Sequence, residues 1–300
     1  MKKMLFQFFL WTTSLVLFGC ASAPPTPPVM APTVSLVAPK IPPKIGLALG
    51  GGAARGFAHV GVIQVLEEAG ITPVLVTGTS AGSLVAALYA SGKNGAQLQK
   101  VAETMEESTI ADWTLPFFGR GVLRGEALAK YVNLQVGQKP IEAMPMPLGI
   151  VATDLNSGND MLFQRGDTGT AVRASSAVPA VFTPVKINGH EYVDGGLSSP
   201  VPVRAARKMG AELVIAVDIS SPPEGSSASG TIEVLLQTFS IMGKSINGFE
   251  LKDADVVVRP VLTGVSSSDF SSRKRSIEAG RQAMLQALPQ LRLAIAAKSR

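Results

Sequence analysis

Gly78-Thr79-Ser80-Ala81-Gly82 lies between an apolar run, Val74–Val76, and a stretch with helical character, Ser83–Tyr89. This order predicts a strand, a sharp turn and a helix, with the serine on the turn and its hydroxyl exposed. Glycines on both sides of the serine allow the tight turn and keep side chains away from the hydroxyl. Because G-x-S-x-G is common by chance, a catalytic interpretation depends on the rest of the chain.

From Lys44 onward, short apolar runs alternate with amphipathic stretches. Such alternation predicts parallel strand pairing and a layered α/β fold. We predict strands at Ile45–Leu49, Val74–Val76, Leu148–Thr153, Glu191–Val193, Leu213–Val217 and Val256–Arg259. We predict helices at Gly56–Ala69, with Gly70 as its C-cap, from Ser83 through Ala90, at Gly95–Ser108, and at Ile277–Ala297 with an interruption at Pro289. Ser220–Gly230 is rich in proline, serine and glycine, which predicts a surface loop.

Composition limits the classes of function. The chain has 300 residues, of which 46% are hydrophobic and 16% charged, so it can build a sizeable core. It has one cysteine, which excludes an intramolecular disulfide and any metal site built from paired thiolates. The formal charge of +5 is mild and falls by two if Lys2 and Lys3 are removed, so no nucleic-acid partner is predicted.

The N-terminus has the organisation of a secretory signal. Met1–Lys3 is basic, and Met4–Phe18 is an apolar segment of about 15 residues, too short to span a membrane comfortably. Leu17–Cys20 resembles the lipobox of bacterial lipoproteins, which implies a signal peptide over residues 1–19 and an acyl group on Cys20. The alternative is that Cys20 is an inert residue of a cleaved signal peptide.

A proline-rich stretch occupies residues 20–43 and predicts a semi-rigid, extended tether. We therefore expect one domain over residues 44–300, held at a bacterial envelope membrane by the lipid on Cys20. Ala21 stands where retention in the inner membrane is associated with aspartate, so the periplasmic face of the outer membrane is favoured.

A glycine-rich loop, Gly50–Gly56, follows the first predicted strand. Its spacing fits neither the G-x-G-x-x-G dinucleotide fingerprint nor the Gly-Lys-Ser/Thr of a phosphate loop. A third interpretation is an oxyanion hole, in which backbone amides hold the charge that develops on a carbonyl oxygen. Ser80, one strand later, favours the oxyanion hole, and a purely structural turn remains the alternative.

A base for Ser80 is harder to choose. The chain has two histidines: His59 falls within the first predicted helix, and His190 lies in a turn just before Asp194. A packing or polar-surface role is commoner for a histidine placed like His59, and His190 precedes Asp194, the reverse of the order in α/β-hydrolases. These observations favour a carboxylate as the base. Asp154, Asp194 and Asp218 all end predicted strands, and spacing alone does not rank them.

Three motifs together resemble the patatin-like phospholipase family: Gly50–Gly56, Gly78–Gly82 and Asp194–Gly196. The segment Arg173–Pro179 is also similar to bacterial members, and the likeness covers roughly Ile45 to Ala211. The resemblance implies a three-layer α/β/α sandwich with a mainly parallel sheet. It also implies a lipid acyl-ester hydrolase, with no metal or cofactor.

The resemblance implies roles for individual residues. Ser80 would be the nucleophile and Asp194 its base, in a dyad without histidine that acts through an acyl-enzyme. The oxyanion amides would belong to Gly51, Gly52 and Ala53. The supporting motif residues would be Gly50, Arg55, Gly56, Gly78, Gly82, Gly195 and Gly196. The chain departs from the family pattern where Ala53 replaces the third glycine and Gly50 replaces an aspartate.

Two other functions stay open: an acyltransferase with the same dyad, and a non-catalytic envelope adaptor. The expected substrate is a membrane lipid or another acyl ester, while protein partners are unknown. We also interpret the apolar stretch Trp113–Gly119 either as core or as a flap that admits acyl chains.

Overall fold

The computed structural model describes residues 41–300 except 107, 109–111, 113–120, 221–229 and 267–268. The predicted signal peptide, Cys20, the tether up to residue 40, the predicted flap Trp113–Gly119 and most of the predicted loop Ser220–Gly230 lie outside the described residues. Within the described part of the chain, no helix is both long enough and apolar enough to cross a membrane.

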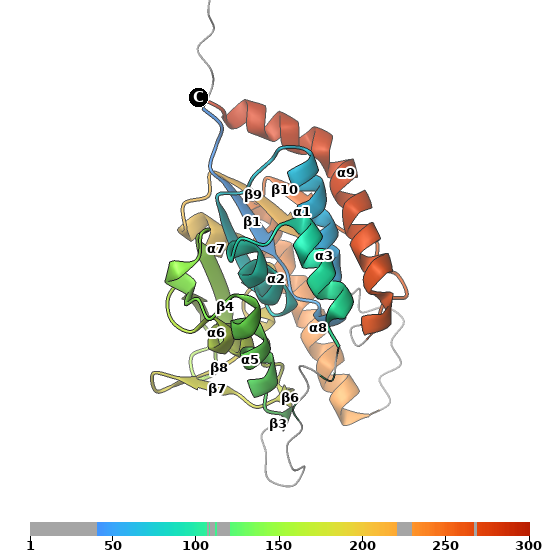
Figure 1. The fold of residues 1–300 in the computed structure, drawn as a ribbon. Coiled ribbons are helices and arrows are strands. Elements are labelled where there is room, and N and C mark those ends of the chain that lie inside the picture. The colour runs from blue at the N-terminus through green and yellow to red at the C-terminus, as the bar shows by residue number, and fades with distance from the viewer. Residues whose placement is uncertain (1–40, 107, 109–111, 113–120, 221–229, 267–268) are drawn as a thin grey trace, which may run out of the picture. The chain divides into compact units, whose positions relative to one another are not determined.

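An eight-stranded sheet forms the centre of the fold (Figure 1). Hydrogen-bonded neighbours follow the order β10-β9-β1-β2-β4-β8-β7, and β5 also pairs with β4. The strands are β1 (Ile45–Leu49), β2 (Leu75–Thr79), β4 (Leu148–Asp154), β5 (Asp160–Phe163), β7 (Val185–Ile187), β8 (His190–Asp194), β9 (Leu213–Val217) and β10 (Val256–Val258). The pairs from β10 to β4 are parallel, whereas β5, β8 and β7 pair antiparallel. A separate small sheet joins β3 (Gly121–Leu123) to β6 (Ala180–Phe182).

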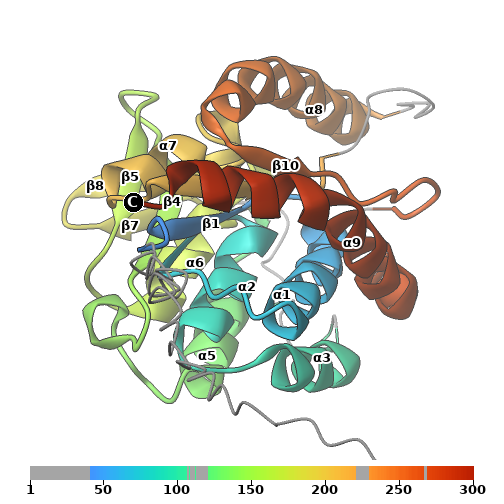
Figure 2. The ribbon, with the colours of Figure 1, turned by 90° about the horizontal axis from the view of Figure 1, so that it is seen from above.

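Helices cover both faces of the sheet. They are α1 (Ala58–Glu68), α2 (Ala81–Ala90), α3 (Gly95–Thr104), α5 (Glu126–Gln135), α6 (Thr168–Ser175), α7 (Val203–Lys208), α8 (Thr231–Glu250) and α9 (Arg273–Lys298). Short 3₁₀ turns complete the described elements: η1 (Ala53–Phe57), η2 (Ile141–Ala143), η3 (Gly195–Leu197), η4 (Leu251–Asp253) and η5 (Phe270–Ser272). Figure 2 shows α1, α2 and α3 on one side of the sheet and α7 and α8 on the other.

The alternation of side chains along β1 creates the two cores. Leu47 and Leu49 pack into the larger core, which also takes apolar residues of α1, α2 and α9. Ala48 faces the opposite way, into a smaller core that contains Val203 and Ala206 of α7. Because successive residues of a strand point to opposite faces, one five-residue apolar run serves both layers. The predicted three-layer α/β/α sandwich is therefore confirmed.

Most predicted elements are found, and two of them differ from the prediction. The strand predicted at Val74–Val76 is Leu75–Thr79 and continues through half of the glycine–serine motif. The predicted interruption at Pro289 is wrong, because α9 runs unbroken over Arg273–Lys298. Buried residues on both sides of Pro289, Met284 and Leu291, hold the helix against the core and offset the hydrogen bond that proline removes.

The register of β4 explains how two distant segments meet. Val151 pairs with Thr79 of β2 and with Leu162 of β5, so these strands lie on opposite edges of β4. Ala152 pairs with Met161 of β5 and with Asp194 of β8. Strand β8 therefore lies on the same edge of β4 as β2, opposite β5. The ends of β2 and β8 therefore meet on one edge of β4. This places Asp194 next to Ser80, the residue that follows Thr79.

Candidate active site

Ser80 occupies the turn between β2 and α2. Its backbone angles are φ 53° and ψ −125°, a conformation that side-chain-bearing residues rarely adopt. Gly82 makes this turn possible, because a Cβ there would lie 2.1 Å from the carbonyl oxygen of Leu49. A Cβ on Gly78 would lie 2.4 Å from the carbonyl oxygen of Gly82. The two glycines thus let strand and helix approach closely enough to hold the half-buried Ser80 in this strained conformation.

Two buried serines support the turn. The backbone N–H of Ser80 donates to Ser175 Oγ at 2.8 Å, and Ser175 Oγ donates to the carbonyl oxygen of Val151 at 2.5 Å. Ser83 Oγ donates to the carbonyl oxygen of Ser80 at 2.6 Å. Ser175 was not singled out from sequence as a site residue, although it lies in the segment Arg173–Pro179 that resembles bacterial family members. Its role depends on a contact 95 positions away in the chain.

Asp194 is the aspartate that reaches the serine. Ser80 Oγ donates to Asp194 Oδ2 at 2.7 Å, and the backbone N–H of Gly196 donates to Asp194 Oδ1 at 2.7 Å. The Asp194 backbone is held as well, because its N–H donates to Ala177 and its carbonyl accepts from Thr153 Oγ1. Hydrogen bonds to both carboxylate oxygens and to the Asp194 main chain therefore hold the carboxylate in place against Ser80.

Burial changes the chemistry of this carboxyl group. Asp194 is 7% exposed, and desolvation raises its pKa from 3.8 to about 6, against the opposing effect of hydrogen bonds from Gly196 and Ser80. A carboxylate with a pKa near 6 is ionised at neutral pH and is a stronger base than an exposed aspartate. It can accept the Ser80 proton.

The other candidate bases are engaged elsewhere. Asp154 accepts from the backbone of Asn156 and Ser157 and pairs with His190 Nδ1 at 2.9 Å. Asp218 accepts from Ser220 and from Arg259 Nε. The tertiary structure thus separates three aspartates that spacing alone did not rank, and Asp194, which the family resemblance implied, is the one in contact with Ser80.

His59 supports the glycine loop instead of acting as a base. It is fully buried, and its Nε2 lies 2.8 Å from the carbonyl oxygen of Gly50, to which it donates. Burial lowers the pKa of His59 to about 4, so the ring is neutral at physiological pH. The interaction anchors the first residue of the loop to α1.

The glycine loop lies directly against Ser80. A Cβ on Gly51 would lie 3.2 Å from Ser80 Cβ, which shows how closely the backbone approaches the serine. The predicted set of oxyanion donors is reduced, however, because the Gly51 N–H donates to the carbonyl oxygen of Pro200 at 3.0 Å. Within the described residues, the amides of Gly52 and Ala53 donate to no protein acceptor. These two amides are the available donors in this conformation.

Ala53 and Arg55 differ from the glycines of the loop in backbone strain and in charge. Ala53 adopts φ 50°, a left-handed conformation that suits the glycine usual at this place in the family pattern. Arg55 is 7% exposed and its Nε has no partner in the described structure. Burial lowers the Arg55 pKa and the charge of Asp218 opposes this shift. A guanidinium keeps its proton at neutral pH, so Arg55 places a positive charge in the turn that follows the loop.

The remaining motif glycines permit close backbone packing. A Cβ would come within 3.0 Å of a neighbouring atom at Gly50, Gly56, Gly195 and Gly196. Gly195 makes the closest approach, 2.2 Å from the carbonyl oxygen of Val151 on β4. These residues shape the site without contributing side-chain chemistry.

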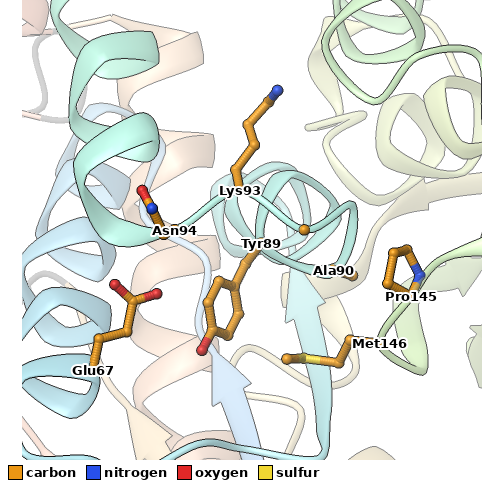
Figure 3. A pocket seen from close by; sticks show the side chains of 8 residues that line it. Glu67, Tyr89, Ala90, Lys93, Asn94, Pro145 and Met146 are labelled. Carbon is orange, nitrogen blue, oxygen red and sulfur yellow. The ribbon is translucent and has the colours of Figure 1, made fainter.

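A pocket of about 270 Å³ lies at the other end of α2 (Figure 3). Tyr89, Ala90, Pro145 and Met146 line it together with Glu67 and Asn94. The Tyr89 pKa is raised to about 12 by burial and by the charge of Glu67. A ten-residue helix is about 15 Å long, so this pocket is too far from Ser80 to hold a reacting ester. Among the described residues, no cluster of histidine, cysteine or acidic side chains could hold a metal ion.

A serine on a strained strand–helix turn, with a carboxylate on its hydroxyl, defines the class of α/β serine ester hydrolases. The model of the patatin-like phospholipase family matches residues 47–207, more than half of the chain, and the protein belongs to this family.

Comparisons with individual proteins agree with this assignment. The chain is 35% identical over 216 residues to an uncharacterized NTE family protein of Mycobacterium tuberculosis, covering 72% of this chain and 60% of that protein. It is 34% identical over 200 residues to human patatin-like phospholipase domain-containing protein 6, covering 62% of this chain and 14% of that protein. The chain thus spans about 60% of the mycobacterial relative and a small part of the human one.

Among solved structures, VipD from Legionella pneumophila is similar, with a TM-score of 0.55 and 15% sequence identity. The match covers 83% of this chain and 67% of that one. At this identity the likeness concerns the fold, and it agrees with the α/β architecture described above.

Proposed function

We propose that this protein is a lipid acyl-ester hydrolase that uses Ser80 and Asp194 as a catalytic dyad. The observation that carries the proposal is the 2.7 Å hydrogen bond from Ser80 Oγ to Asp194 Oδ2 at a strained turn. Membership of the patatin-like phospholipase family supports a lipid ester as the substrate.

In the first half of the reaction, Ser80 Oγ attacks the ester carbonyl carbon while Asp194 takes the hydroxyl proton. The carbonyl oxygen becomes an oxyanion, which accepts hydrogen bonds from the Gly52 and Ala53 amides. The bond to the leaving alcohol then breaks. Asp194 returns the proton to the alcohol oxygen, and the acyl group stays on Ser80 as an ester.

In the second half, water replaces the alcohol. Asp194 takes a proton from the water as it attacks the acyl-enzyme, and the same two amides hold the second oxyanion. Ser80 then leaves with the proton that Asp194 returns. The products are a fatty acid, an alcohol and the free enzyme, and no step uses a cofactor.

Product analysis tests the proposed hydrolysis. Full-length protein incubated with phosphatidylcholine is expected to release fatty acid and lysophosphatidylcholine in equal amounts, measured by mass spectrometry. The same incubation with glycerol as an added acceptor separates hydrolysis from acyl transfer. Glycerol esters that outnumber free fatty acid would indicate an acyltransferase, and intact lipid with folded protein would favour the non-catalytic adaptor.

We also propose that the protein is anchored at the bacterial envelope through an acylated Cys20, with the periplasmic face of the outer membrane favoured. The basic and apolar segments before Leu17–Cys20, and the proline-rich tether after it, support this location. Metabolic labelling with palmitate is expected to label the wild type and not Cys20→Ser. Equal labelling of both, or of neither, would contradict the anchor.

A further inference from the structure

Helix α8 has apolar side chains on its solvent side. Val234, Ile241 and Met242 are 52%, 51% and 49% exposed, and Phe249 is 62% exposed. Leu235 belongs to the same surface at 36%. At 3.6 residues per turn, these five positions fall within an arc of about 120° on the helix. We call this surface the α8 face: Val234, Leu235, Ile241, Met242 and Phe249.

The opposite side of α8 is also apolar in part. Leu236, Phe239 and Ile246 are half-buried, and Asn247 and Glu250 are buried. A helix with apolar residues on two sides has a second surface that the protein's own core does not cover. Between Thr231 and Gly243 the chain has a single charged residue, Glu233. Such a surface is typical of a site that binds another apolar phase.

Helix α8, which carries this surface, packs against segments next to the candidate active site. Glu250 Oε1 accepts from Ser199 Oγ at 3.2 Å, and α8 contacts η3, the turn that directly follows Asp194. A Cβ on Gly243 would be 3.8 Å from Pro200, whose carbonyl holds the Gly51 amide. The helix thus packs on the segment that connects the aspartate to the glycine loop.

Figure 1 shows at which end of the molecule helix α8 begins. Strand β1 starts beside the C-terminus, where Ile41 and Arg300 exchange backbone hydrogen bonds, and runs toward the lower end of the view. Ser80 follows β2, which is parallel to β1, so it lies at this lower end. The first turns of α8 extend past the sheet at the same end.

We propose that the α8 face is a lipid-docking surface, which enters the boundary between headgroups and acyl chains and holds the end of the sheet that carries Ser80 near the bilayer. The inference rests on the proposed function, because a lipid ester as substrate is what makes a bilayer the expected occupant. Lys244 and Lys252 are exposed next to the face, with Lys252 Nζ 5.2 Å from the Phe249 ring centroid. Lysines beside an apolar helix surface complement lipid phosphates.

A fluorescent probe tests docking directly. Cys20 is the only cysteine, so a Cys20→Ser background with Ile241→Cys takes one environment-sensitive NBD label on the α8 face. Phosphatidylcholine vesicles are expected to shift its emission to the blue and raise its intensity severalfold. Val74→Cys is the matched control: Val74 is 47% exposed and directly precedes β2, at the other end of the sheet, so its label should not respond.

Kinetics provide the second readout. The triple variant Val234→Ser, Ile241→Ser and Met242→Ser is expected to hydrolyse phosphatidylcholine vesicles at least tenfold more slowly. Its hydrolysis of soluble p-nitrophenyl butyrate should stay within twofold of the wild type. Leu293→Ser is the matched control, because Leu293 on α9 is 73% exposed and belongs to another surface.

Three results would overturn the inference: an unchanged spectrum at position 241, equal loss on both substrates, or a probe response that depends on protein concentration without vesicles. The last would identify a second copy of the chain as the occupant. If the wild type hydrolyses neither substrate, the proposed function fails, and the probe experiment still decides whether the α8 face binds lipid.

Discussion

Replacing Ser80 by alanine is expected to lower kcat/KM for p-nitrophenyl butyrate by about 10⁴-fold or more, because Ser80 Oγ is the hydroxyl that donates to the Asp194 carboxylate in the described part of the chain. A fluorophosphonate should add one label to the wild type, located at Ser80 by peptide mass spectrometry, and none to Ser80→Ala. The variant should still fold, since its Cβ occupies the same strained turn and Ser80 Oγ is a part-buried group with one partner.

Ser91→Ala is the matched control for this experiment. Ser91 follows the same helix at its other end, where its Oγ donates to the carbonyl oxygen of Leu88 at 2.7 Å. It should keep full activity and full labelling. Undiminished hydrolysis by Ser80→Ala would refute the dyad, and an unlabelled but folded wild type would favour the non-catalytic adaptor.

Replacing Asp194 by asparagine is the second large change. We expect kcat/KM to fall by about 10³-fold, within the range usual for loss of a general base, because an amide cannot accept the Ser80 proton. Asp154→Asn is the control: it removes a carboxylate from the end of β4 that pairs with His190 and does not touch Ser80. That variant should stay within a few-fold of the wild type. Similar losses in both variants would point to general damage at this end of the sheet.

Asp194→Asn should also stabilise the folded protein at alkaline pH. Burial raises the Asp194 pKa from 3.8 to about 6, so the folded state holds this proton more tightly than the unfolded chain does. The resulting stabilisation is complete below pH 3.8 and is lost as the pH rises through about 6. At pH 8 the ionised carboxylate costs roughly 3 kcal/mol relative to a neutral group. Urea unfolding should find Asp194→Asn more stable than the wild type at pH 8, with a smaller difference at pH 4.

The pH profile of the wild type provides an independent check on the base. Because Asp194 must be ionised to accept the proton, kcat/KM for the soluble ester should rise about tenfold between pH 5 and pH 7, with a midpoint near the Asp194 pKa of about 6. The residual activity of Asp194→Asn should lack this rise. A midpoint near 4 would indicate an exposed carboxylate as the base.

Local patterns predicted most of the fold. The strands Ile45–Leu49 and Leu213–Val217 were predicted with their observed bounds, because short apolar runs between breakers specify buried parallel strands. Helix α8 was not predicted, and its apolar residues on two sides conceal the periodicity of an ordinary surface helix. The interruption predicted at Pro289 is wrong because the packing of α9 on both sides of the proline outweighs its local helix-breaking preference.

The sequence by itself determined the strand–helix turn at Ser80 and the glycine loop, since both depend on residues that are neighbours in the chain. Gly78, Ser80 and Gly82 create the turn together, and their spacing is its signature. Spacing did not rank the three aspartates, and although the family resemblance implied Asp194, only the tertiary structure shows the contact with Ser80, which depends on β2 and β8 meeting on one edge of β4. It likewise decided that Ser175 supports the turn and that Pro200 occupies the Gly51 amide. Such contacts join residues about 100 or more positions apart, and no local pattern in the chain encodes them.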